Sequence, residues 1–163
     1  MISKLLRYSL LLLSCALAGE SASPKALPTL SLQELAGKSV NTSAWKGKVV
    51  LVDFWATWCV ACRASIPILN NLQQRYAAQG LQIAAISIDE DKSLAEKFTR
   101  KAKMAYPVFH DPKDQTSAPF VVKSLPTLLL FGKDGKLLYR TEAIARDEEA
   151  RLEKLIQKEL EAK

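Results

Sequence analysis

The chain has 163 residues, of which 48% are hydrophobic and 25% charged, and this balance excludes a disordered, collagen-like or coiled-coil protein. The length fits one domain that is large enough to bury a core. The formal charge of +6 comes from 23 basic and 17 acidic residues that are mixed along the chain, so we expect a solvated surface and no nucleic-acid partner.

The first 23 residues have the layout of a secretory signal. Lys4 and Arg7 give a positive start, an apolar run follows, and the sequence Ala16-Leu17-Ala18 offers a small-residue cleavage site. The apolar run is too short to span a bilayer, which needs about 20 such residues. We therefore predict a signal peptide over residues 1–23 and an exported protein of the bacterial periplasm or cell envelope.

Cys15 leaves two fates of this segment open. The stretch Leu12-Leu13-Ser14-Cys15 resembles a bacterial lipobox, in which the cysteine is acylated after cleavage and anchors the protein in a membrane. Leu13, however, stands where a small residue is more usual, and plain signal cleavage is the alternative. In both cases the mature protein keeps one cysteine pair, Cys59 and Cys62.

Strand and helix patterns alternate through the rest of the chain. The patterns predict a hairpin within 30–40, strands over 49–52, 81–88, 106–109, 128–131 and 137–140, a helix that Gly80 ends, helices over 94–104 and 147–160, and a loop over 111–122 with one helical turn. Asp134-Gly135 is a strong hairpin signal between the last two strands. The order predicts one α/β domain over 27–163, with a mixed central sheet flanked by helices and an N-terminal β-hairpin extension.

The cysteine pair stands where a buried strand gives way to a helix. Export would place the pair in an oxidising compartment, where disulfides persist. A disulfide across so short a loop stabilises a fold little, and a zinc site would need more ligands than the single distant His110. We therefore predict a reversible redox pair, with no metal and no cofactor.

The two cysteines are expected to have different roles. Unpaired N–H groups and the macrodipole at a helix start favour a thiolate at Cys59, and Arg63 adds positive potential. Cys62 lies one turn inside the helix and should be shielded. Cys59 should therefore exchange with a substrate disulfide, and Cys62 should resolve the mixed disulfide.

Several segments resemble the thioredoxin superfamily. The run from Val52 to Cys62 is similar to the active-site signature of that superfamily. Four further segments resemble the exported TlpA/ResA-like branch of the superfamily, namely residues 63–67, 86–89, 106–112 and 125–127. These marks occur in order from about residue 27 to the end of the chain. The resemblance implies a thioredoxin fold and a thiol–disulfide oxidoreductase.

The resemblance also implies roles for four further residues. Pro126 matches the cis-proline of the family, Leu125 before it would pair its backbone with a bound peptide, and Trp58 matches an indole that contacts partners. Asp53 is a single carboxylate in an apolar strand, so burial should raise its pKa and let it exchange a proton with Cys62. The alternatives are packing for Trp58, a trans strand-entry proline for Pro126 and a satisfied strand-end carboxylate for Asp53.

Two features depart from the family pattern. Val60-Ala61 between the cysteines supplies neither a proline nor a charge, which leaves the direction of electron flow open. The stretch 83–86 lacks the lysine that thioredoxins usually place near the buried carboxylate, so we expect Asp53 to hold its proton more firmly.

We therefore expect an exported enzyme that reduces or exchanges disulfides in envelope proteins, with cytochrome c maturation as one such role. Its partners would be exported proteins with thiols or disulfides, and a membrane or envelope reductase that returns electrons. One alternative is a copper metallochaperone, although such relatives usually space their cysteines by three and use a further histidine. The other is a peroxiredoxin-like peroxidase, whose Thr-x-x-Cys arrangement is echoed by Thr57-Trp58-Cys59 with the wrong spacing.

Overall fold

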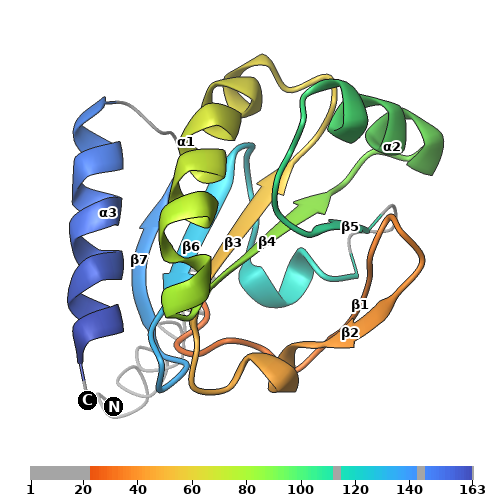
Figure 1. Ribbon diagram of the computed structural model, residues 1–163. Coiled ribbons are helices and arrows are strands. Elements are labelled where there is room, and N and C mark those ends of the chain that lie inside the picture. Colours follow the sequence, from red (N-terminus) through yellow and green to blue (C-terminus); the bar gives the residue numbers. More distant parts are fainter. Residues whose placement is uncertain (1–22, 112–114, 143–145, 163) are drawn as a thin grey trace, which may run out of the picture.

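The computed structural model describes residues 23–111, 115–142 and 146–162 (Figure 1). The predicted signal peptide up to residue 22, with Cys15, lies outside the described residues, so export and lipid anchoring stay predictions. Within the described ranges no helix combines the length and the hydrophobicity that a bilayer crossing requires.

The described residues form two sheets, as the sequence predicts. An antiparallel hairpin of β1 (Ser31–Gln33) and β2 (Ser39–Asn41) leads into the 3-10 helix η1 (Thr42–Trp45). The main sheet has the strand order β5-β4-β3-β6-β7, in which β3, β4 and β5 are parallel and β6 is antiparallel to both of its neighbours. Its strands are β3 (Val49–Trp55), β4 (Leu81–Ser87), β5 (Val108–His110), β6 (Thr127–Phe131) and β7 (Leu137–Thr141).

Three α-helices and two further 3-10 helices complete the part of the fold that the structure describes. They are α1 (Val60–Tyr76), η2 (Ala77–Gln79), α2 (Lys92–Lys101), η3 (Ala118–Phe120) and α3 (Arg146–Glu161). Gly80 ends the first helical region in a left-handed conformation with φ 108°, as its position predicts. The mixed sheet, the flanking helices and the N-terminal hairpin confirm the predicted architecture.

Some boundaries differ from the predicted ones. Strand β3 runs three residues further, to Trp55, because it pairs with β4 along that whole length. Helix α2 begins two residues earlier, since the Asp91 side chain accepts a hydrogen bond from the Ser93 N–H at 2.8 Å and caps the helix. Strand β5 begins two residues later than the predicted 106–109 and ends one residue later, at His110.

The two faces of the main sheet are covered differently (Figure 1). From β3 through α1 to β4, and from β4 through α2 to β5, the chain moves in one direction across the sheet, so right-handed crossovers place both helices on one face. Helix α3 joins them there through the buried Leu152 and Ile156. The hairpin, η1 and η3 cover the other face, which holds the aromatic side chains Trp45, Phe54, Phe109, Phe120 and Phe131.

The parallel strands bring their carboxyl ends to the same edge of the sheet. Trp55, Ser87 and His110 are register partners across β3, β4 and β5, and each ends its strand. The segments that follow these three residues therefore meet at this edge. They carry the groups described next.

Candidate functional site

The cysteine pair lies at the start of α1, as predicted. Cys59 is the N-cap residue, and its Sγ accepts a hydrogen bond from the Cys62 N–H at 3.1 Å. The Cys59 N–H donates to the Ala56 carbonyl at 3.1 Å, which closes the turn between β3 and the helix. The two sulfur atoms are joined in a disulfide. A sulfur that accepts a helix N–H is the sulfur that the helix start stabilises as a thiolate after reduction.

Both cysteines are largely covered in the disulfide form. Cys62 is 2% exposed and Cys59 is 7% exposed, so the expected asymmetry is present but small. The side chains on either side of Cys59 are exposed to solvent instead: Trp58 is 65% exposed and Val60 is 75% exposed. A partner that reaches Cys59 therefore meets an apolar surface on both sides of it.

Asp53 is buried in the middle of the sheet, on the face that the α-helices cover. Its neighbours in register are Ala85 and Leu128, and its Oδ1 has no hydrogen-bond partner among the described residues. Desolvation raises the pKa of Asp53 from 3.8 to about 7. The nearby Tyr106 is also buried, and burial followed by the Asp53 charge raises its pKa. The apolar surroundings that the sequence predicts for Asp53 are therefore present.

A second buried carboxylate, Asp89, holds the loop before the cysteine pair. Asp89 follows β4, and its carboxylate accepts the Thr57 N–H at 3.0 Å, the Thr57 hydroxyl at 2.6 Å and the Ser87 hydroxyl at 2.8 Å. The Arg63 guanidinium donates to the Thr57 carbonyl at 2.8 Å from the other side. Thr57 is thus fixed at both its N–H and its carbonyl, two residues before Cys59.

A third buried carboxylate, Asp111, stands at the end of β5. It accepts the backbone N–H groups of Gln115, Thr116 and Ser117 at 3.1, 2.7 and 3.2 Å. His110 beside it places its Nε2 2.7 Å from the Asp89 carbonyl oxygen, which explains this residue as a structural contact between two strand ends. No role was predicted for Asp89 or Asp111. Their positions within two residues of the ends of two parallel strands were the signal that could have singled them out.

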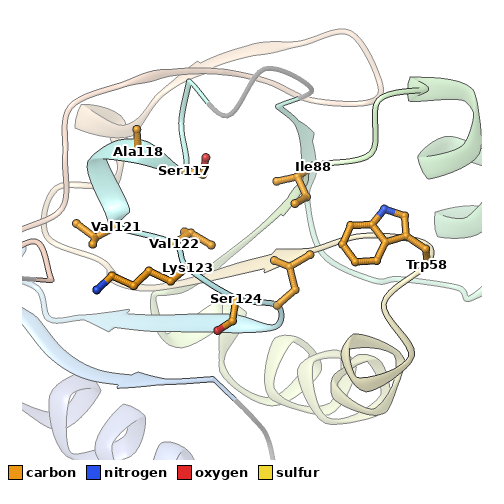
Figure 2. A pocket seen from close by; sticks show the side chains of 9 residues that line it. Trp58, Ile88, Ser117, Ala118, Val121, Val122, Lys123 and Ser124 are labelled. Carbon is orange, nitrogen blue, oxygen red and sulfur yellow. The ribbon is translucent and has the colours of Figure 1, made fainter. Parts of the chain in front are cut away.

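A groove of about 580 Å³ opens at Trp58, the residue directly before Cys59. Figure 2 shows Trp58 and Ile88 on one side and Val121, Val122, Lys123 and Ser124 on the other. Leu125 also lines the groove, and its bond to Pro126 is cis, as the resemblance implies. The structure therefore brings Trp58 and Leu125 together at one cavity beside Cys59.

Within the described ranges, no group of three or more His, Cys, Asp or Glu side chains is arranged to hold a metal ion. The chemistry that the described geometry offers is thiol–disulfide exchange at Cys59, which is bonded to a second cysteine and lies on the same face of the sheet as a buried carboxyl group.

Comparison with known proteins gives consistent matches. The Redoxin family model matches residues 22–156. The thiol-disulfide oxidoreductase ResA of Geobacillus thermodenitrificans is 34% identical over 110 residues, which span 68% of this chain and only 63% of that relative. ResA of Bacillus cereus is 31% identical over 134 residues, or 82% of this chain and 76% of the relative. A proposed thiol:disulfide interchange protein DsbE from Chlorobium tepidum has a similar structure, with a TM-score of 0.79, 34% identity, and coverage of 85% of this chain and 98% of the other.

Proposed function

The chain belongs to the Redoxin family, and on this premise we propose that it is a thiol–disulfide oxidoreductase that uses Cys59 and Cys62 to reduce or exchange disulfides in other proteins. The observation that carries the proposal is the placement of the pair: a disulfide at the N-cap of α1, with a buried carboxyl group on the same face of the sheet and an apolar groove beside it. The names of the relatives that match most of the domain support the same reaction.

The proposed reaction balances as two successive exchanges. In the reduced enzyme the Cys59 thiolate attacks one sulfur of a client disulfide, so that a mixed disulfide forms and the first client thiolate leaves. The Cys62 thiol then loses its proton and attacks the Cys59 sulfur, and the second client thiolate leaves. The client gains two electrons, and the Cys59–Cys62 disulfide is restored.

Asp53 is the proposed acceptor of the Cys62 proton. It faces the helix-covered side of the sheet, where Cys62 is also buried, and water has little access to either group. A carboxyl group with a pKa of about 7 is partly ionised at neutral pH, so it can take a proton from a thiol and release it again. A carboxyl group with an ordinary pKa would be a weaker base for this step.

The groove is the proposed site for the client polypeptide. Its lining by Trp58 and Leu125 beside the exposed Val60 fits an extended apolar segment on either side of the client cysteine. The backbone of Leu125, before the cis-proline, is the proposed pairing partner for that segment.

Export completes the proposal. The signal-like residues 1–23 support a periplasmic or envelope location, with Cys15 as the lipid attachment point if that cysteine is acylated. The clients would then be exported proteins with thiols or disulfides, apocytochrome c among them, and a membrane or envelope reductase would return the electrons.

Insulin reduction in the presence of dithiothreitol tests the activity. We expect the protein to accelerate the precipitation of the insulin B chain, and Cys59→Ala to remove this acceleration because no nucleophile is left. Cys62→Ala should accumulate a mixed disulfide through Cys59, seen as a mass increase that a reductant reverses. Turbidity that equals that of dithiothreitol alone would refute the proposal. Stoichiometric copper binding to the pair, measured by mass spectrometry, would favour the metallochaperone instead.

A further inference from the structure

The side of the groove opposite Trp58 is an irregular segment. Residues 117–125, here called the wall segment, contain only the short helix η3 and otherwise connect it to β6. Seven of its residues line the groove, namely Ser117, Ala118, Val121, Val122, Lys123, Ser124 and Leu125. Because no sheet ladder or α-helix fixes this segment, other groups must hold its backbone in place.

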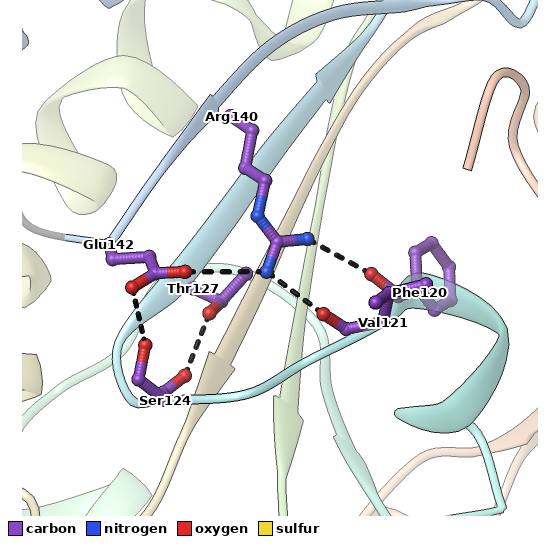
Figure 3. Close-up of polar contacts among 6 residues, drawn as sticks. All are labelled: Phe120, Val121, Ser124, Thr127, Arg140 and Glu142. Atoms are coloured by element: carbon purple, nitrogen blue, oxygen red, sulfur yellow. Dashed lines mark hydrogen bonds and ion pairs between the residues drawn. The ribbon is translucent and has the colours of Figure 1, made fainter. Parts of the chain in front are cut away.

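Arg140 holds the segment from behind (Figure 3). It lies on β7, and its two terminal nitrogens donate to the carbonyl oxygens of Phe120 and Val121, each at 3.0 Å. Glu142 accompanies it, with one carboxylate oxygen 3.5 Å from the Arg140 guanidinium and the other accepting the Ser124 hydroxyl at 2.7 Å. The Arg140 side chain is only 18% exposed, so it forms a largely buried connection between β7 and the wall segment.

The backbone at this point needs such support. Val121 has φ 56° and ψ 48°, a left-handed conformation that a β-branched residue rarely adopts. Such a conformation persists only where the surrounding structure imposes it. It leaves the two successive carbonyls of Phe120 and Val121 within reach of a single planar guanidinium. Lysine, with one point-like ammonium, lacks the rigid fork that holds two acceptors at once.

We propose that Arg140 is a positioning residue that sets the affinity of the enzyme for polypeptide clients by fixing the wall segment of the groove. The inference rests on the proposed function, because it assigns the groove to the client. Arg140 touches neither the cysteine pair nor, on this view, the client. Its loss should therefore weaken client binding and leave the chemistry at Cys59 unchanged.

Two disulfide substrates separate these effects. Bis(2-hydroxyethyl) disulfide is too small to span the groove, whereas a synthetic peptide with one internal disulfide and valine and leucine flanks would occupy it. Each is mixed in excess with the reduced protein, and the oxidation of the pair is followed by tryptophan fluorescence over a concentration series. For Arg140→Lys we expect the half-saturating peptide concentration to rise about fivefold, and for Arg140→Gln about tenfold or more. The limiting rate and the rate with the small disulfide should stay at the wild-type value.

A matched control removes a guanidinium from the neighbouring part of the fold. Arg151 of α3 stacks on Tyr139 of β7, with 4.8 Å from its guanidinium carbon to the ring centroid, and it does not line the groove. Arg151→Gln should leave both substrates unaffected. If Arg140→Gln does not fold by circular dichroism, Arg140→Lys decides alone.

Three outcomes would overturn the inference. If the half-saturating peptide concentration of Arg140→Lys equals that of the wild type, Arg140 does not set the affinity for the client. Equal losses with both substrates would show a general structural role, as would an equal effect of Arg151→Gln. A wild-type protein that reacts with neither disulfide would instead refute the proposed function itself, so the two failures are distinguishable.

Discussion

The two faces of the central sheet differ in whether their buried polar groups have hydrogen-bond partners. Along β3, Val50, Val52 and Phe54 point to the face covered by η1, η3 and the hairpin, where they meet an aromatic cluster. The alternate residues Leu51, Asp53 and Trp55 point to the face covered by the α-helices. One strand thus contributes to two cores of different character.

Within the described ranges, the buried polar atoms without a hydrogen-bond partner lie on the helix-covered side of the sheet. These atoms belong to side chains of the three α-helices, of β3 and of the loop before β5: Asp53, Trp55, Ser65, Gln73, Thr99, Tyr106 and Glu148. On the aromatic face, buried hydroxyls such as those of Thr42 and Thr127 are hydrogen-bonded. Unpartnered buried polar groups oppose folding. Asp53 is one of them and lies on the face that also carries Cys59 and Cys62, so we expect this face to serve the reaction and the aromatic face to serve stability.

The largest expected difference between the two faces is the pH dependence of the unfolding free energy, which Asp53 adds on the helix-covered face. Folded Asp53 keeps its proton up to about pH 7, whereas the unfolded group ionises near 3.8. Its favourable contribution is therefore complete below about pH 4 and is lost as the pH rises to 7. A shift of this size corresponds to about 4 kcal/mol of unfolding free energy. Asp53→Asn should remove this fall, so the stability of the variant relative to wild type should rise by that amount between pH 4 and pH 8.

Urea unfolding at a series of pH values measures this effect. Val52→Ala is the control on the aromatic face, since it removes buried methyl groups and should cost about 2 kcal/mol at every pH. In stopped-flow measurements, the same Asp53→Asn substitution should slow the resolution of the mixed disulfide more than it slows its formation. Parallel pH profiles for wild type and Asp53→Asn would mean that the carboxyl is not perturbed by burial, and the contrast between the faces would fail.

The hydrophobic pattern was sufficient to predict the order of strands and helices, because alternate burial and helical spacing are local properties of the sequence. It also predicted the burial of Asp53, since a single carboxylate within the apolar run before the cysteines belongs to a strand that is buried on both faces. The contacts of Asp89 with Thr57 and of Arg140 with Val121 join residues 32 and 19 positions apart. Such contacts depend on how strands pair and on a left-handed valine, which no local pattern encodes.

A smaller effect on the unfolding free energy is expected for Asp89, which lies at the edge formed by the carboxyl ends of the parallel strands. Asp89→Asn keeps the volume of the side chain but removes its charge and one acceptor from the loop before Cys59. Hydrogen bonds to charged groups contribute about 1.5–3 kcal/mol each, so we expect a loss of about 2 kcal/mol in unfolding free energy. The rates with the small disulfide and with the peptide should fall together, because the Cys59 loop serves both substrates. An effect confined to the peptide would place Asp89 in the groove wall instead.

The smallest effect on stability is expected at Trp58, and it contrasts with Trp55 three residues earlier. Trp55 is 2% exposed on the helix-covered face, so Trp55→Ala should cost about 3–5 kcal/mol in unfolding free energy. Trp58 is 65% exposed, so Trp58→Ala should change that free energy by less than about 0.5 kcal/mol. Since Trp58 lines the groove, the same variant should raise the half-saturating peptide concentration about threefold to tenfold. Chemical denaturation and the two-substrate assay measure these quantities. If Trp58→Ala instead lowered stability as Trp55→Ala does and left peptide binding intact, this indole would be a packing residue, and the open surface beside Cys59 would have to recognise clients without it.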